Sequence, residues 1–406
     1  MWTPHQRGEA ALAIYAAAEA DRRAQPHRYL LDPASVVEAV QARGGFAADD
    51  DGDWREGLDV YLASARDEGR LNALGLRNVA STAAGKLIAR RAIAEALRAA
   101  PEIRRLRVDR PLFVIGGWRT GSTLLQRLLA AVPGLRAAYP AELTVAWRFA
   151  GLDERSRGEL IAAGEEAHNR LHVLNPRMSI IHPSGGRLPE ECVLAMGTDL
   201  RNWGLTSTLR CPGYAHWLLT QDMVPSYRRY ADILRLLQDD SGRRWILKAP
   251  AHTAALDSLL TVFPDALVIH LHRDVVQTVT SGSSLFAEFR SIYSDEVDGA
   301  DVGRYQLETT VTWFDRVMAA RDANPRAQVL DVAYPDLAAD PLAAVRRICA
   351  VADVPWDAQS DAATRARLVE LRAQHGVHRY EPEDFGLNPG EVRERFSAYR
   401  ARFEVT

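Results

Sequence analysis

The chain has 406 residues, of which 47% are hydrophobic and 25% charged, and its formal net charge at pH 7 is −3. This composition is typical of a globular protein with a sizeable core, and the length accommodates about two to three domain-sized units. The balanced charge excludes the strong basic excess of a nucleic-acid-binding protein. Three widely spaced cysteines exclude a disulfide framework. No apolar run approaches the ~18 residues of a membrane span, so we expect no span and a cytoplasmic location.

The N-terminal quarter is rich in Ala and Arg at helical spacing. A helix start with Asp and Pro opens the segment 31–40, and two further periodic runs cover 54–65 and 71–97. We therefore expect a helical N-terminal region over residues 1–107. Because no cluster of polar groups of the kind that forms a site is visible in it, we expect a structural cap without a direct role in substrate binding.

Beyond this region the pattern changes to alternating strands and helices. The expected strands are 112–115, 245–247, 267–271 and 328–332, and the expected helices are 122–131, 252–262, 275–289 and 342–350. This alternation predicts an α/β fold, a P-loop-like parallel sheet flanked by helices, with ligands bound beyond the carboxyl ends of the strands. We expect this domain to cover 108–390, with a helical insertion over 139–241 that builds a pocket above the ligand edge, and a last helix over 391–406.

The most informative stretch is PLFVIGGWRTGSTLLQRLLA, residues 111–130, where an apolar strand breaks into a Gly-rich turn and leaves it as an amphipathic helix. Such a turn holds a phosphate with backbone N–H groups and the positive end of the helix dipole. Aligning Gly116 and Gly121 with G-x-x-x-x-G-K-[ST] places Ser122 where a triphosphatase has its lysine. This disfavours cleavage of a triphosphate. The loop instead carries Arg119, Thr120, Gly121, Ser122 and Thr123.

A second landmark is ALVIHLHRDVVQTVTSGSSL, residues 266–285. A strand delivers Arg273 at its carboxyl end, and the following helix carries Ser281 two turns further on, so both can face the same sheet edge as the first loop. The alternative for Arg273 is a surface cation paired with Asp274.

His270 and His272 share one face of the same strand, as a pair of metal ligands would. We find no third ligand at a suitable spacing in the sequence. We therefore expect packing or hydrogen bonding for the two imidazoles, and no metal site.

Three segments in this order, GWRTGSTLL, WILKAPAHTAALDSLLTVFPDALVIHLHRD and HLHRDVVQTVTS, resemble the sulfotransferases that use 3′-phosphoadenosine 5′-phosphosulfate (PAPS). More narrowly, they resemble the bacterial branch akin to protein-tyrosine sulfotransferases. The resemblance runs from 111 to 356 and extends weakly to HGVHRYEPEDFGL. It implies an enzyme that moves a sulfuryl group from PAPS to a hydroxyl of a small-molecule, lipid or glycoside acceptor, without a metal.

The resemblance also implies roles for particular residues. The loop from Arg119 to Thr123 corresponds to the family's 5′-phosphosulfate site, and Arg273 and Ser281 keep the interval of its 3′-phosphate site. Further cofactor contacts fall on Tyr334, for which a core position is the alternative, and on Arg379, for which a solvated cation is the alternative.

For catalysis, the resemblance implies Glu142 as the base that takes the acceptor proton, with Lys248 and Arg119 neutralising charge in the transition state. Glu142 has an alternative as a buried ion-pair partner of an arginine. Competing bases are His182, Glu190 and Glu191 in the insertion; the plainer role of the two glutamates is as acids in the first turn of a helix.

Two other functions compete with sulfuryl transfer. One is a nucleotide or small-molecule kinase on a P-loop-type fold, which the missing loop lysine and the lack of an acidic strand end for Mg²⁺ disfavour. The other is a catalytically silent nucleotide-binding protein. Binding of adenosine 3′,5′-bisphosphate rather than ATP with magnesium separates the first function from the kinase.

Overall fold

Five parallel strands form one sheet in the order β2-β3-β1-β4-β5. The computed structural model describes residues 2–239, 241–373 and 380–405. The strands are β1 (Leu112–Gly116), β2 (Leu135–Arg136), β3 (Arg244–Lys248), β4 (Leu267–His272) and β5 (Gln328–Ala333). Because every pairing is parallel, the carboxyl ends of all strands lie at the same edge of the sheet.

The central strand shows why the sheet is buried on both faces. Side chains alternate along a strand, and β1 sends Phe113 and Ile115 into one apolar cluster and Leu112 and Val114 into another. All five residues of β1 are buried. A continuous apolar run is therefore the expected sequence for such a strand, and helices have to cover both faces.

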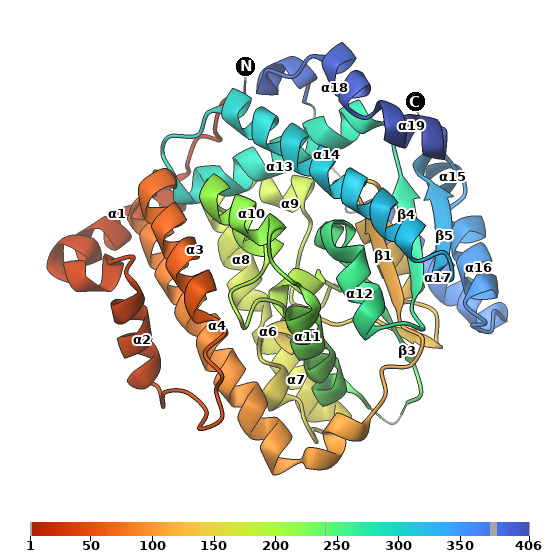
Figure 1. The fold of residues 1–406 in the computed structure, drawn as a ribbon, viewed down its shortest axis with the longest axis horizontal. Coiled ribbons are helices and arrows are strands. Elements are labelled where there is room, and N and C mark those ends of the chain that lie inside the picture. Colours follow the sequence, from red (N-terminus) through yellow and green to blue (C-terminus); the bar gives the residue numbers. More distant parts are fainter. Residues whose placement is uncertain (1, 240, 374–379, 406) are drawn as a thin grey trace.

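Helices from different parts of the chain cover the two faces. The cluster that contains Phe113 also holds residues of α11 (Val224–Leu237), α12 (Leu256–Val262), α13 (Val275–Tyr293) and α14 (Gly299–Ala323). The cluster that contains Leu112 holds residues of α5 (Ser122–Leu129), α15 (Tyr334–Ala339), α16 (Pro341–Val351) and α17 (Ala358–Ala373). Figure 1 shows the strands between these two groups. The expected α/β class, a parallel sheet flanked by helices, is confirmed.

The N-terminal region is helical, as expected. It consists of α1 (Glu9–Ala24), α2 (Pro33–Gln41), α3 (Arg55–Glu68) and α4 (Ala73–Ala99), and 3₁₀ turns at Pro26–Tyr29 and Pro101–Arg105. Asp32 caps α2 by accepting from the backbone N–H of Ser35, and Asn72 caps α4 by accepting from that of Gly75. The long helix α4 contacts the other three helices and also packs against α13 of the core. It therefore connects this region to the sheet domain (Figure 1).

The insertion between α5 and β3 is mostly helical, again as expected. Its helices are α6 (Pro140–Thr144), α7 (Glu154–Ala163), α8 (Glu165–Leu174), α9 (Met178–Ile181), α10 (Pro212–Leu219) and α11, and 3₁₀ turns lie at Ala146–Arg148, Cys192–Leu194 and Trp203–Thr206. In the described part of the chain, none of the helices combines the length and apolar character that crossing a bilayer requires.

The differences from expectation lie mainly at element ends. The helix expected over 252–262 is a 3₁₀ turn, Pro250–Ala255, followed by α12, and the edge strand β2 is too short for a periodic signal. The expected last helix is divided into α18 (Pro389–Arg395) and α19 (Ser397–Phe403), since Phe396 leaves helical geometry at φ −100° and ψ 16°. A further 3₁₀ turn, Pro382–Phe385, precedes α18.

Candidate active site

The loop between β1 and α5 has a backbone that few residues tolerate. Gly116 and Gly121 have φ values of +134° and +86°, and Arg119 has a φ of +58°. A Cβ on Gly116 would lie 2.5 Å from the carbonyl oxygen of Leu271, so β4 excludes any side chain there. Gly121 precedes α5 without a side-chain cap, which leaves the first-turn N–H groups to bind an anion. A non-glycine residue at positive φ costs about 1–2 kcal/mol and is characteristic of functional loops.

Residues at the ends of four strands converge around this loop. The loop follows β1, Lys248 ends β3, Arg273 follows β4 and Tyr334 follows β5. The loop, Arg273 and Tyr334 line a cavity of about 180 Å³, together with Glu191 and His182 of the insertion. This is the ligand edge that the parallel topology predicts.

The two predicted anion-binding arginines are neighbours. Nη1 of Arg273 donates to the carbonyl oxygen of Arg119 at 2.5 Å, and its guanidinium lies 4.2 Å from the centre of the Tyr334 ring. Gln277 accepts from the same guanidinium at 2.6 Å. The side chain of Arg119 donates to the carbonyl oxygen of Ile181 at 2.7 Å, which ties the loop to the insertion. Arg273 is therefore not paired with Asp274, and both cations lie on one cavity.

Three other predicted cofactor contacts, Thr120, Ser281 and Arg379, are not among the described residues that line this cavity. The Thr120 hydroxyl is buried and donates to the carbonyl oxygen of Gly117 at 3.0 Å, so this side chain closes the turn and leaves anion contacts to its neighbours. Ser281 is buried in α13, and it is not among the described residues that line the cavity. Arg379 lies outside the described residues.

Lys248 links the phosphate loop to the insertion. Its ammonium group is buried and donates to a carboxylate oxygen of Glu191 at 2.7 Å and to the Thr123 hydroxyl at 3.2 Å. The Glu191 side chain is 19% exposed, so it keeps access to a ligand. The pair places a carboxylate and an ammonium group at the mouth of the phosphate loop.

Glu142 does not join this group. Only 2% exposed, its carboxylate accepts from Arg136 at 3.0 Å and from Arg157 at 2.8 Å, and it also accepts from the backbone N–H of Tyr139 at 3.0 Å. Arg136 lies in β2 and Arg157 in α7, so the carboxylate fastens the start of the insertion to the edge of the sheet. In the structure Glu142 is thus a buried ion-pair partner, the alternative to the role of base, and its oxygens are already occupied by fixed donors.

Glu190, the neighbour of Glu191, is also paired. Its carboxylate lies 3.4 Å from Nε2 of His182. Burial opposes ionisation of Glu190, but its interaction with His182 and the positive charges of Lys248 and Arg127 outweigh burial and lower the pKa of the carboxyl to about 2. Glu190 is thus an orienting anion for His182. Neither glutamate lies in an α-helix, since both precede the 3₁₀ turn at Cys192–Leu194.

A second cavity, of about 310 Å³, adjoins the first. Trp118, His182, Glu191 and Leu285 line both, so Glu191 and His182 stand between the cavity at the loop, which carries the two arginines, and a second, more apolar cavity. The volume lies in the range of small-molecule sites, about 300–1,000 Å³. Trp118 packs with its ring centre 4.9 Å from that of Phe286 in the wall.

The second cavity bears on the expected role of the N-terminal region. Its lining includes Asn78, Thr82 and Lys86 of α4. The N-terminal region therefore supplies part of a cavity wall. The polar residues that form this wall are spaced four apart along one helix, and because each is unremarkable alone, the sequence showed no cluster.

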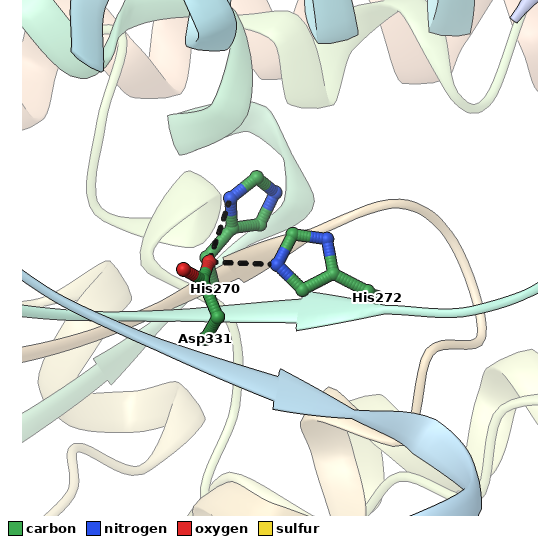
Figure 2. A group of neighbouring side chains, drawn as sticks. All are labelled: His270, His272 and Asp331. Atoms are coloured by element: carbon green, nitrogen blue, oxygen red, sulfur yellow. Dashed lines mark hydrogen bonds and ion pairs between the residues drawn. The ribbon is translucent and has the colours of Figure 1, made fainter. Parts of the chain in front are cut away.

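His270 and His272 do have a third polar partner, which the sequence analysis missed (Figure 2). Asp331 of the neighbouring strand β5 lies 2.8 Å from Nε2 of His272 and 4.0 Å from Nδ1 of His270. Arg321, however, forms two bonds to the same carboxylate at 2.6 and 2.9 Å, and its Nη1 also lies 3.2 Å from Nδ1 of His270. The carboxylate of the group is therefore already paired with a guanidinium. The group is a hydrogen-bonded network that holds α19 through Tyr399, 2.6 Å from Nδ1 of His272.

The fold and the site together define a class of protein. It is an α/β protein with a P-loop-like turn, cationic residues at several strand ends and an adjoining, largely apolar cavity. The model of the sulfotransferase family matches residues 111–358, more than half of the chain, and the chain belongs to this family.

Curated relatives and solved structures agree with this assignment. The chain is 26% identical over 257 residues to the omega-hydroxy-beta-dihydromenaquinone-9 sulfotransferase Stf3 of Mycobacterium bovis, and the match covers 59% of this chain and 62% of the relative. It is 30% identical to the crystal structure of sulfotransferase STF1 from Mycobacterium tuberculosis, with a TM-score of 0.79 over 90% of this chain and 98% of the other. For STF9 from Mycobacterium avium the TM-score is 0.81 at 24% identity, over 93% and 98% of the two chains.

Proposed function

We propose that the chain transfers a sulfuryl group from PAPS to a hydroxyl of a largely apolar small-molecule or lipid acceptor. One observation carries the proposal: Glu191, paired with Lys248, stands where a cationic loop cavity meets an apolar cavity. The relative named for a hydroxylated menaquinone derivative supports a lipid-like acceptor. Because the three cysteines are free thiols, we also propose a cytoplasmic location.

The residues of the first cavity fit an adenosine nucleotide with two separate anionic groups, one at its 5′ end and one at its 3′ position. Arg119 and Arg273 are separate cations on one wall, and Ser122 and Thr123 add hydroxyl groups at the N-terminus of α5. Tyr334 offers an aromatic face beside Arg273. We assign the loop to the 5′ end of the nucleotide and Arg273 to the 3′-phosphate. The donor supplies an SO₃ group attached to a phosphate leaving group.

In this proposal different side chains remove the acceptor proton and neutralise the charge of the transition state. Glu191 takes the proton of the acceptor hydroxyl as the new O–S bond forms. Lys248 and Arg119 neutralise negative charge on the transferred group and on the departing phosphate as the S–O bond breaks. Lys248 is placed for this role because it already bridges Glu191 and Thr123 of the loop.

His182 is the second candidate for the base. It lines both cavities, as Glu191 does, and the Glu190 carboxylate orients its ring. Two single variants, His182→Asn and Glu191→Gln, separate these candidates. The variant that lacks the true base should lose most of kcat and keep its nucleotide affinity, whereas the other should keep most of kcat.

Ligand-induced stabilisation tests the proposed function directly. Adenosine 3′,5′-bisphosphate at about 100 times its Kd should stabilise the fold by ~2.7 kcal/mol, which corresponds to a rise of about 3 °C in Tm for a chain of this size. ATP with magnesium should give a smaller rise. Transfer of labelled sulfate from PAPS to a panel of apolar alcohols and phenols completes the test. A preference for ATP with magnesium, or bisphosphate binding without transfer to any acceptor, would refute the proposal.

A further inference from the structure

The apolar cavity beside Glu191 has a wall that comes from outside the matched family region. Asn78, Thr82 and Lys86 lie on α4, whereas the family model begins at residue 111. Their spacing of four places the three side chains on one face of the helix, above one another. Each is partly buried, and all three line the cavity. The N-terminal region therefore presents a polar stripe, with one lysine, to a cavity whose exposed lining is largely apolar but also includes polar residues of the insertion such as Asn202, Ser207 and Thr208.

The apolar part of the cavity comes from two other segments. Leu285, Phe286 and Phe289 are contributed by α13, and Val193 and Leu194 by the 3₁₀ turn that follows Glu191. An acceptor whose hydroxyl reaches Glu191 thus meets apolar side chains along its body. Among the residues that line this cavity, the stripe on α4 contributes the one lysine, Lys86, with which a second polar group of the acceptor can pair.

Lys86 is the strongest hydrogen-bond donor of this stripe. Its ammonium group donates to the backbone carbonyl oxygens of Leu194 and Met196, each at 2.6 Å. These bonds fix the ammonium group beside the turn that carries Glu191, and they use two of its three N–H donors. Among the described residues, no carboxylate lies within ion-pair distance of it.

The charge of Lys86 is poorly compensated. Burial lowers the pKa of Lys86 to about 8, although Asp199 acts in the opposite direction. The group still carries its proton for most of the time at neutral pH. A ligand that brings an oxygen atom with lone pairs would recover some of the hydration that the ammonium group has lost.

We propose that α4 forms a specificity wall of the acceptor site, and that Lys86 selects hydroxylated apolar acceptors that carry a second, hydrogen-bond-accepting oxygen, a carbonyl or a carboxylate. The inference rests on the proposed function, since it takes the second cavity as the acceptor site. It adds a recognised group to the acceptor and assigns a binding role to the N-terminal helices.

Three probes with the same chain and the same terminal hydroxyl test this wall: 8-hydroxyoctanoate, its methyl ester and 1-octanol. In the wild-type protein, kcat/KM should be about 10- to 100-fold higher for at least one of the two oxygen-bearing probes than for 1-octanol, as expected for a hydrogen bond to a charged group. A preference for the acid over the ester identifies a carboxylate as the recognised group, and equal values identify a carbonyl. Lys86→Met should abolish the preference and leave the Kd for adenosine 3′,5′-bisphosphate unchanged.

A second variant tests the same wall and leaves intact the two hydrogen bonds from Lys86 to backbone carbonyl oxygens. Thr82→Leu fills the cavity from the same face of α4, and it should lower kcat/KM for all three probes by at least about 10-fold without changing bisphosphate affinity. Probe binding to the bisphosphate complex, measured by calorimetry, gives the same comparison without turnover. Equal affinity of the wild type for the three probes, no binding of any probe, or an unaltered preference in Lys86→Met would overturn the inference. Loss of bisphosphate binding in the wild type would instead refute the proposed function.

Discussion

Two glutamates compete for the role of base, and the structure predicts opposite consequences for their removal. Glu142 is buried between Arg136 and Arg157, and Glu191 lies beside Lys248 on two cavities. Glu142→Gln should therefore act on the stability of the fold, and Glu191→Gln on the chemical step.

The size of each effect follows from its surroundings. Removing one partner of a buried ion pair costs about 3–5 kcal/mol, and an amide that keeps part of the hydrogen bonding belongs near 3 kcal/mol. For a chain of 406 residues the entropy of unfolding is about 0.85 kcal/mol per degree, so Glu142→Gln should lower Tm by about 4 °C. Loss of a general base costs about 100-fold or more in kcat. Glu191→Gln should show this loss in kcat per folded molecule, accompanied by a decrease in Tm of at most about 4 °C, because the variant leaves the buried ammonium group of Lys248 without its carboxylate partner.

Paired measurements on the two variants decide the matter. Tm from calorimetry, kcat from sulfate transfer and the Kd of adenosine 3′,5′-bisphosphate are measured on the same preparations, and kcat is expressed per folded molecule. Glu142→Gln should keep kcat, and both variants should keep nucleotide affinity within about threefold. A large loss of kcat in Glu142→Gln at full stability, with Glu191→Gln still active, would show that the ion-pair interpretation is wrong.

Three further predictions concern the nucleotide, pH and metals. Arg273→Ala should remove most of the preference for adenosine 3′,5′-bisphosphate over adenosine 5′-monophosphate, about 10- to 100-fold in Kd; titration calorimetry measures it, and an unaltered preference would exclude Arg273 from the 3′-phosphate site. Burial lowers the pKa of His252 to about 3 and that of His270 well below its ordinary value. The folded state thus binds fewer protons than the unfolded state below pH 6.5, and stability is full above this pH and falls as pH drops. Between pH 7.5 and 5.5 the His252 imidazole should cost about 1.4 kcal/mol of stability and His270 should add a loss in the same direction, and denaturation at the two pH values that shows no loss would contradict this. Zinc and EDTA should each leave Tm unchanged because Arg321 already occupies the Asp331 carboxylate, and a metal-dependent rise in Tm would overturn this assignment.

Much of the core followed from local pattern. The expected strands begin within a residue of β1, β3, β4 and β5, because a buried parallel strand is a short continuous apolar run. The phosphate loop was visible for a similar reason: Gly116 and Gly121 occupy backbone conformations that other residues resist, and their spacing is local. The two-residue strand β2 and the break at Phe396 depend on neighbours and gave no such signal.

The amino-acid sequence alone therefore determined the core strands, the Gly-rich loop of the type that binds anions, and the position of Arg273 after a core strand, because each of these features is encoded within about twenty consecutive residues. Only the tertiary structure decided which acid lies at the cavities. Glu142 and Glu191 look alike in sequence, but two arginines from distant segments surround the first and Lys248 holds the second at the cavity. The same holds for α4, whose polar face became a cavity wall when α13 packed against it. The role of a charged side chain depends on the partners that folding brings to it, and those partners are separated from it by tens of residues or more.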